Sequence, residues 1–216
     1  MAERQEKDEL TPRQRDVLER ALELLVAGGE KALTTAGLAR AANCSKESLY
    51  KWFGDRDGLL AAIIAHQASK VRGFTDSGLP MSRDIFETHL QGFAEDLLRV
   101  LAGDVSLALN RLAIGQASRE GNRLGSLLVA QGRRRVDRAA TALLEAGKRC
   151  GHIAYDDLDD AYRSLYGLIV RDLHVRMLLG EANLLPSGVL EAQAAHAIQQ
   201  FFALYGVREK ETAERI

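Results

Sequence analysis

The side chains best suited to chemistry lie close together in the chain, between Ser45 and Arg56. This stretch combines hydroxyl, aromatic and cationic groups with two carboxylates, Glu47 and Asp55. Such groups hydrogen-bond phosphates and base edges. The segment therefore favours recognition of a polyanion over a covalent reaction. We find no nucleophile elbow, phosphate-cradling glycine loop or cysteine and histidine cluster, and the spacing predicts neither a catalytic site nor a metal site.

Two short helices joined by a tight turn must position these groups. The apolar spacing of two buried helical faces is carried by Leu38, Ala39, Ala42, Leu49 and Phe53. Between the two faces, Asn43 tolerates the left-handed backbone of a turn, and Ser45 can cap the helix that follows. The sequence predicts a helix-turn-helix.

In a helix-turn-helix the second helix can enter the major groove of DNA. We predict that Thr34, Ser45, Tyr50, Trp52 and Arg56 anchor phosphates. Bases or the nearest backbone are predicted to be contacted by Lys46, Glu47, Ser48 and Lys51. The alternative is an ordinary helical hairpin whose polar face meets water. The grouping of aromatic, hydroxyl and cationic side chains within so few residues favours DNA.

The same residues resemble the DNA-binding region of the TetR family of bacterial transcriptional regulators. The positions of the family pattern are occupied by Thr34, Leu38, Ala39, Ala42, Asn43, Cys44, Ser45, Leu49, Tyr50, Phe53, Arg56 and Leu59. The departures are Asn43 for glycine, Cys44 for valine, Glu47 for a small residue, Trp52 for histidine and Arg56 for lysine. A weaker resemblance, over 111–117 and 167–174, points to one subgroup of the family.

Composition agrees with an all-α protein of one or two domains. The 216 residues are 46% hydrophobic, and three prolines interrupt the chain. No stretch alternates Val, Ile and Thr as a strand would. With the resemblance, this predicts a three-helix DNA-binding domain over 1–55, after a disordered tail of about ten residues. A larger helical effector-binding and dimerisation domain follows over 56–216, and a linker around 73–80 follows the fourth helix.

Downstream, the apolar spacing predicts several long helices. They include one segment from about Gly121 to Lys148, one helix from about Asp156 to Leu179 and a last helix from Ser187 to about Tyr205. The net charge is −1, so attraction to phosphate depends on local cations such as Arg13. The N-terminus lacks the apolar core of a secretory signal, and no apolar run is long enough for a membrane span. We therefore expect a cytoplasmic protein.

The resemblance implies a homodimer formed by the last two helices. Suitable faces are offered by Leu165, Ile169, Asp172, Leu173, Arg176, Ala195, Gln199, Phe202 and Tyr205. The alternative is that these residues close the core of a monomer. A dimer would also read two half-sites of a palindrome, which improves discrimination against other DNA.

The resemblance further implies a small-molecule effector pocket in the second domain. Its predicted lining is Phe86, Leu90, Phe93, Leu97, Asn110, Ile114, Tyr162 and Tyr166. We expect no cofactor. Cys44 and Cys150 are too far apart in sequence to suggest a structural disulfide in a reducing compartment, and Cys44 is a candidate redox sensor at the turn.

Three hypotheses follow. The first is a transcriptional regulator, a repressor released from a palindromic operator by a small molecule. The second is a helical protein-interaction module that no longer binds DNA. The third is a helical enzyme or ligand carrier. The grouping of Tyr50, Lys51 and Arg56 favours the first, because a module that never meets phosphate has no need to group them.

Overall fold

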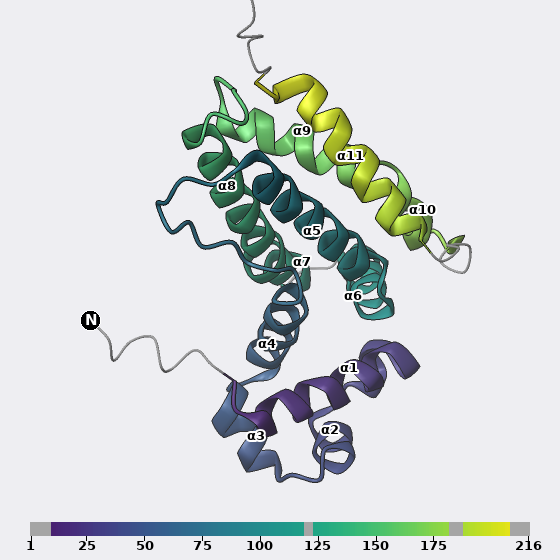
Figure 1. Cartoon of the computed structure of the whole chain (residues 1–216). Helices are drawn as coiled ribbons and strands as arrows, with labels where there is room; N and C mark the ends of the chain where they lie inside the picture. Colours follow the sequence, from purple (N-terminus) through teal and green to yellow (C-terminus); the bar gives the residue numbers. More distant parts are fainter. Residues whose placement is uncertain (1–9, 119–122, 182–187, 208–216) are drawn as a thin grey trace, which may run out of the picture. The chain divides into compact units, whose positions relative to one another are not determined.

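The structure, a computed structural model, describes residues 10–118, 123–181 and 188–207 (Figure 1). These residues form helices and connecting turns, and the described part of the chain contains no strand beyond an isolated bridge between Ile153 and Gly206. The all-α prediction is confirmed. The predicted disordered tail and the predicted helix start at Ser187 lie outside the described residues.

The helices divide into two compact units. The first contains α1 (Pro12–Ala32), α2 (Thr35–Ala41), α3 (Lys46–Phe53), α4 (Arg56–Ala68), α6 (Asp104–Gln116), α7 (Leu124–Leu127) and the π-helix η2 (Leu128–Arg133). The second contains α5 (Arg83–Ala102), α8 (Arg134–Arg149, from Arg135 on), α9 (Leu158–Val170), α10 (Leu173–Leu178) and α11 (Val189–Tyr205).

The compact units do not follow the domain boundary predicted after residue 55. The first unit runs to Ser69 and resumes over Gly103–Arg134. The reason is packing: Leu60 and Ile63 of α4 are buried in the same apolar cluster as α1, α2 and α3. Within this unit α6 contacts α1, and η2 contacts α4. That residues 1–55 form the DNA-binding part of the protein remains a prediction.

The second unit has its own apolar core. Phe86, Leu90 and Leu97 of α5 pack there with Leu165 of α9 and Phe201 of α11, each at most 1% exposed. Helix α11 contacts both α5 and α9. Apolar residues recur every three or four positions in these segments. A helix places them on one face that the core can bury, which explains why the segments are helical.

Two predicted helices differ from the structure. The segment predicted as one helix over 156–179 is broken between α9 and α10, because Arg171 has a left-handed φ of 48°. Gln193 donates a hydrogen bond of 2.6 Å to the carbonyl oxygen of Ile169 near this end of α9. The segment predicted from Gly121 to Lys148 contains the π-helix η2, and Gly121 itself lies outside the described residues. A periodic apolar pattern in the sequence does not distinguish a π-helix from an α-helix.

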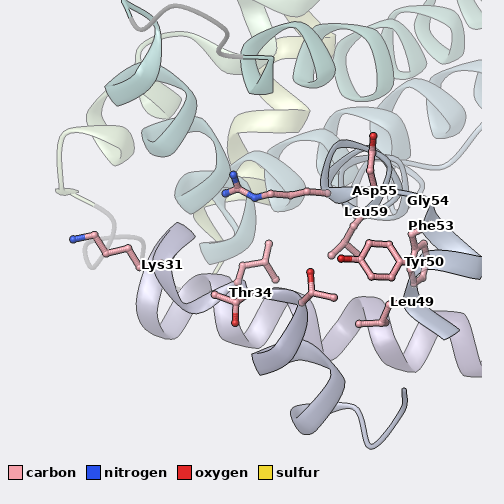
Figure 2. A pocket seen from close by; sticks show the side chains of 11 residues that line it. Lys31, Thr34, Leu49, Tyr50, Phe53, Gly54, Asp55 and Leu59 are labelled. Atoms are coloured by element: carbon pink, nitrogen blue, oxygen red, sulfur yellow. The ribbon is translucent and has the colours of Figure 1, made fainter. Parts of the chain in front are cut away.

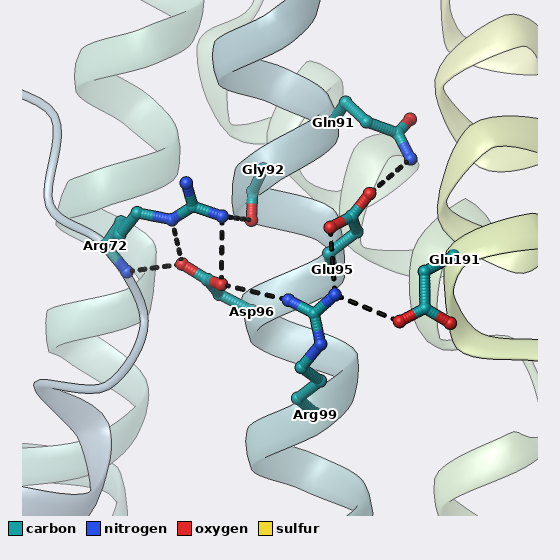
Figure 3. Close-up of polar contacts among 7 residues, drawn as sticks. All are labelled: Arg72, Gln91, Gly92, Glu95, Asp96, Arg99 and Glu191. Atoms are coloured by element: carbon teal, nitrogen blue, oxygen red, sulfur yellow. Dashed lines mark hydrogen bonds and ion pairs between the residues drawn. The ribbon is translucent and has the colours of Figure 1, made fainter. Parts of the chain in front are cut away.

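A polar network ties α5 to its neighbours in the second unit (Figure 3). The buried carboxylate of Asp96 accepts hydrogen bonds from the backbone amide of Arg72 at 3.1 Å and from its Nε at 2.6 Å. Hydrogen bonding to Asp96 and its charge raise the pKa of Arg72. Arg99 reaches Glu95 and, on α11, Glu191, both at 3.0 Å. These contacts fix the chain that follows α4 and the start of α11 against one face of α5.

Stability should depend on pH through His174 of α10. Its Nε2 is buried without a hydrogen-bond partner among the described residues, and burial lowers its pKa from the ordinary 6.5. The folded state therefore favours neutral imidazole, so stability present above about pH 6.5 is lost as the pH falls. We expect a smaller drop in melting temperature between about pH 7 and pH 5 for His174→Gln than for the unchanged protein. Equal drops would contradict this, and His196→Gln, at an exposed position of α11, is the control.

Candidate nucleic-acid interface

The turn between α2 and α3 has the predicted construction. Asn43 adopts a left-handed φ of 48°, and the amide of Cys44 donates to the carbonyl oxygen of Ala39 at 2.9 Å. Thr34 caps α2 by accepting a bond of 3.0 Å from the amide of Gly37. The helix-turn-helix prediction is therefore confirmed in its local geometry.

Helix α3 is held by its apolar face and exposes most of its polar one. Leu49 and Phe53 are 4% and 9% exposed and belong to the core of the first unit. The predicted DNA-contacting residues that are exposed are Thr34, Ser45, Lys46, Glu47, Tyr50, Lys51 and Arg56. Ser48 and Trp52 are half-buried. One rigid helix thus presents cations, hydroxyls and a carboxylate to the surroundings.

The first turn of α3 orders its own polar side chains. Ser45 caps the helix by accepting a bond of 3.0 Å from the amide of Ser48, and their hydroxyl oxygens are 3.1 Å apart. Hydrogen bonds from the backbone amide of Glu47 and from the Ser45 hydroxyl lower the pKa of the Glu47 carboxyl. The Glu47 carboxyl therefore carries its negative charge at the start of the helix.

Trp52 also has a structural role at the core of the first unit, which was not predicted from the sequence. Its ring packs against the core of the first unit and meets the Phe53 ring edge-on, with centroids 6.3 Å apart. Part of its surface supports the end of α3. Its predicted contact with phosphate remains a prediction for the part of the ring that is still accessible.

A pocket of about 390 Å³ lies beside α3 and gathers three of the predicted phosphate anchors, Thr34, Tyr50 and Arg56 (Figure 2). Its lining comprises Lys31, Leu33, Thr34, Thr35, Leu49, Tyr50, Phe53, Gly54, Asp55, Arg56 and Leu59. In this view Tyr50, Phe53 and Leu59 lie together on one side, and Thr34 and Lys31 lie on the other. Lys31 and Thr35 were not among the predicted DNA-contacting residues. Tertiary packing brings both to the pocket, and Thr35 directly follows the predicted Thr34 in the sequence.

The start of α4 is fixed directly to the end of α3. Asp55 caps α4 by accepting a bond of 2.8 Å from the amide of Gly58. A Cβ atom at Gly58 would collide with the carbonyl oxygen of Phe53, so the two helices approach more closely than any other residue permits. The first turn of α4 is therefore packed directly against the end of α3.

Arg13, which the sequence places among the cations that attract phosphate, is exposed but makes contacts within the protein. Its guanidinium bonds the carbonyl oxygens of Ala42 and Asn43 and pairs with Asp16. One terminal nitrogen of Arg13 therefore bonds the protein backbone, and the other bonds an acidic side chain.

The residues predicted to line an effector pocket are divided between the units. Asn110 and Ile114 lie on α6 in the first unit, and the other six lie in the second. Asn110 donates to the carbonyl oxygen of Ser106 at 2.8 Å, and Ile114 is 63% exposed. Phe86, Leu90, Phe93 and Leu97 fill the core of their own unit, and Tyr162 donates to Asp137. Tyr166 is half-buried against that core. A pocket lined by all eight remains a prediction.

The predicted dimer face needs one correction. Leu165 and Ile169 are fully buried in the core of their own chain and leave no surface for a partner. They are apolar because they face inward toward the other helices of the unit. The accessible members of the set are the exposed Asp172, Arg176, Ala195 and Gln199 and the half-buried Leu173, Phe202 and Tyr205.

Among the described residues, no helix is both long and apolar enough to cross a membrane. Nor do the described His, Cys, Asp and Glu side chains form a group of three that could hold a metal ion. Cys44 and Cys150 are free thiols, both half-buried. The redox role of Cys44 remains a prediction.

These features define an all-helical protein with an N-terminal helix-turn-helix, and comparison with known proteins gives its family. Residues 17–63 match the family "Bacterial regulatory proteins, tetR family", and residues 88–207 match "AefR-like transcriptional repressor, C-terminal domain". The chain belongs to the TetR family of bacterial transcriptional regulators. Regulators of this family bind DNA, typically as homodimers, and are generally not enzymes.

Comparison with solved structures also finds regulators of the TetR family. The chain is similar to a TetR transcriptional regulator from Agrobacterium tumefaciens, with 63% identity and a TM-score of 0.79, covering 91% of this chain and 96% of that one. A TetR-family regulator from Mesorhizobium loti has 24% identity and a TM-score of 0.70, covering 92% and 100%. The flavonoid-responsive regulator FrrA, at 21% identity, has a TM-score of 0.65 and covers 91% and 98%. The last two share the fold. None of the curated proteins compared with the chain matches it.

Proposed function

We propose that this chain is a sequence-specific DNA-binding repressor that a small-molecule effector releases from a palindromic operator. The observation that carries the proposal is the exposed polar face of α3, held in place by Leu49 and Phe53 beneath it and by the cap at Ser45. A rigid short helix with donors and an acceptor on its outer face suits the major groove. Membership of a family of transcriptional regulators supports the same conclusion.

In this proposal the groups around the Figure 2 pocket hold the sugar-phosphate backbone. Thr34, Tyr50 and Arg56 come from three separate elements, so together they fix the register of α3 on the duplex. Ser45 and Trp52 add phosphate contacts at the two ends of α3. Lys46, Ser48 and Lys51 reach bases or the nearest backbone, and a lysine can donate to guanine.

Glu47 should select a base at one position of each half-site. Its carboxylate can accept from a cytosine amino group and repels phosphate elsewhere. We expect Glu47→Ala to relax the preference at one position by about 1–3 kcal/mol and to leave the others unchanged. A randomised operator library read by sequencing measures this. Glu23→Ala, an exposed acid of α1 in the same unit, is the control, and an unchanged preference at all positions would contradict the assignment.

Two chains should assemble through α11 and the end of α9 with α10. The exposed positions of α11 include the small residues Ala192, Ala195 and Ala203, beside Leu204 at 66% exposure. An accessible apolar surface of this kind is typical of an interface. The homodimer is also the usual assembly of the family.

Release by an effector requires that ligand binding and DNA binding favour different states. A ligand that prefers the non-binding state about 100-fold weakens operator binding by roughly 2.7 kcal/mol. The close contact between Gly58 and Phe53 supports α4 as the element that transmits the change, because a shift of its first turn toward α3 would press on the end of α3. A compound that raises the melting temperature should therefore lower operator affinity. Constant affinity across all compounds that bind would contradict release by an effector.

The direct test of DNA binding uses a fluorescein-labelled duplex pool and anisotropy at low and increasing salt. We expect binding that weakens steeply as salt rises, because lysine and arginine displace counterions from phosphates. The Lys46→Ala, Lys51→Ala double variant should bind more weakly and with a shallower salt dependence. Failure to bind any duplex at low ionic strength would favour an interaction module or a ligand carrier.

A further inference from the structure

Arg13 reaches from the first turn of α1 to the end of α2. One terminal nitrogen of its guanidinium donates to the carbonyl oxygen of Asn43 at 2.8 Å and also to that of Ala42. The other pairs with Asp16 at 2.7 Å. The bonded residues are 29 and 30 positions away in sequence, so this is a tertiary contact.

The two carbonyl groups lie at the C-terminal end of α2, where no further helical turn supplies backbone amides to donate to them. Helix α2 ends at Ala41, Ala42 is its C-cap, and Asn43 follows with its left-handed φ of 48°. The last carbonyls of a helix need partners from outside it, and arginine side chains can supply them. An L-residue in the left-handed region is disfavoured, so this turn needs support from its surroundings.

The base from which Arg13 projects is itself ordered. Thr11 and Gln14 form a reciprocal cap: the amide of Thr11 donates to Gln14 Oε1 at 2.8 Å, and the amide of Gln14 donates to Thr11 Oγ1 at 3.2 Å. Val17, one turn further, is fully buried. Because the backbone of this first turn is already ordered, binding of the guanidinium to the turn costs only the rotamer freedom of the Arg13 side chain.

We propose that Arg13 is a positioning residue that holds the turn between α2 and α3 and thereby sets the direction of the recognition helix, without contacting phosphate itself. The sequence alone counts Arg13 among the phosphate-attracting cations. The geometry instead directs one terminal nitrogen to the backbone of the turn and the other to the Asp16 carboxylate. The proposal deepens the proposed function, since the orientation of α3 matters for reading DNA.

The first experiment needs no DNA. Cys44 is half-buried in the turn and can report its opening through its rate of reaction with Ellman's reagent in a Cys150→Ser background. We expect Arg13→Ala to speed labelling of Cys44 several-fold and Arg13→Lys to restore part of the protection. Arg15→Ala, an exposed arginine on the same turn of α1, should leave the rate unchanged. An unchanged rate in Arg13→Ala would overturn the proposal, whether or not the protein binds DNA.

The second experiment measures operator and non-specific affinity between 50 and 200 mM salt, the operator being a duplex selected from a random pool, with Arg56→Ala as the phosphate-binding reference. We expect Arg13→Ala to weaken operator binding about tenfold or more and leave the salt dependence and the non-specific affinity unchanged. Arg56→Ala should weaken both kinds of binding and reduce the slope of log affinity against log salt by about 0.9 for each phosphate that is no longer neutralised. A reduced slope in Arg13→Ala, or unchanged operator affinity, would overturn the proposal.

Discussion

Replacing Phe86 with alanine is expected to lower the free energy of unfolding by about 3–5 kcal/mol, the range for a large aromatic removed from a core. Phe86 is fully buried in the second unit. Its ring stacks on His152 with centroids 5.6 Å apart and meets Phe202 edge-on at 5.9 Å. Urea denaturation followed by circular dichroism measures the loss. Ile85→Ala, at a neighbouring position that is 53% exposed, should stay within about 0.5 kcal/mol.

The same ring makes Gly147 necessary. A Cβ atom at Gly147 would collide with the end of the Phe86 ring, so Gly147→Ala should cost about 1–3 kcal/mol by overpacking. With Phe86 replaced by alanine the space is open, and Gly147→Ala should then cost little. The double-mutant cycle measures this coupling. Simple additivity of the two losses would show that the ring does not fill the space above Gly147.

The second large effect concerns assembly. Ala195→Glu places a carboxylate on the exposed face of α11, and in a symmetric pair the charge enters the interface twice. We expect a monomer at micromolar concentration and an operator affinity at least about 100-fold weaker, because two half-sites are no longer bound together. Analytical ultracentrifugation and anisotropy measure the two effects.

The matched control is Thr88→Glu, which adds the same charge to an exposed position of α5. It should remain a dimer with unchanged operator affinity. A dimeric Ala195→Glu with normal DNA binding would exclude this face of α11 from the interface.

The helix-turn-helix was predictable because its determinants are local. Ser45 and Asp55 cap the helices that directly follow them, and Asn43 takes the left-handed turn position. Leu49 and Phe53 face inward, as their spacing required. Each of these features depends on residues within one or two helical turns, so the local sequence is enough to predict the helix-turn-helix.

The errors arise where tertiary contacts decide. Leu165 and Ile169 are apolar and regularly spaced whether they face a partner chain or their own core, and here their own core covers them. Arg171 adopts a left-handed conformation that a sequence pattern does not announce for arginine. The sequence identifies Arg13 only as a cation near the helix-turn-helix. What its guanidinium binds depends on the approach of α1 to the turn, which only the structure shows.

In the proposed function, two copies of α3 read a palindrome. Selection of bound duplexes from a random pool by the purified, unmodified protein tests it most directly. We predict an enriched palindrome whose half-sites are centred about one helical turn of DNA apart, or a multiple of it. Recovery of sequences with no shared motif, or of a single half-site without its inverted copy, would contradict it.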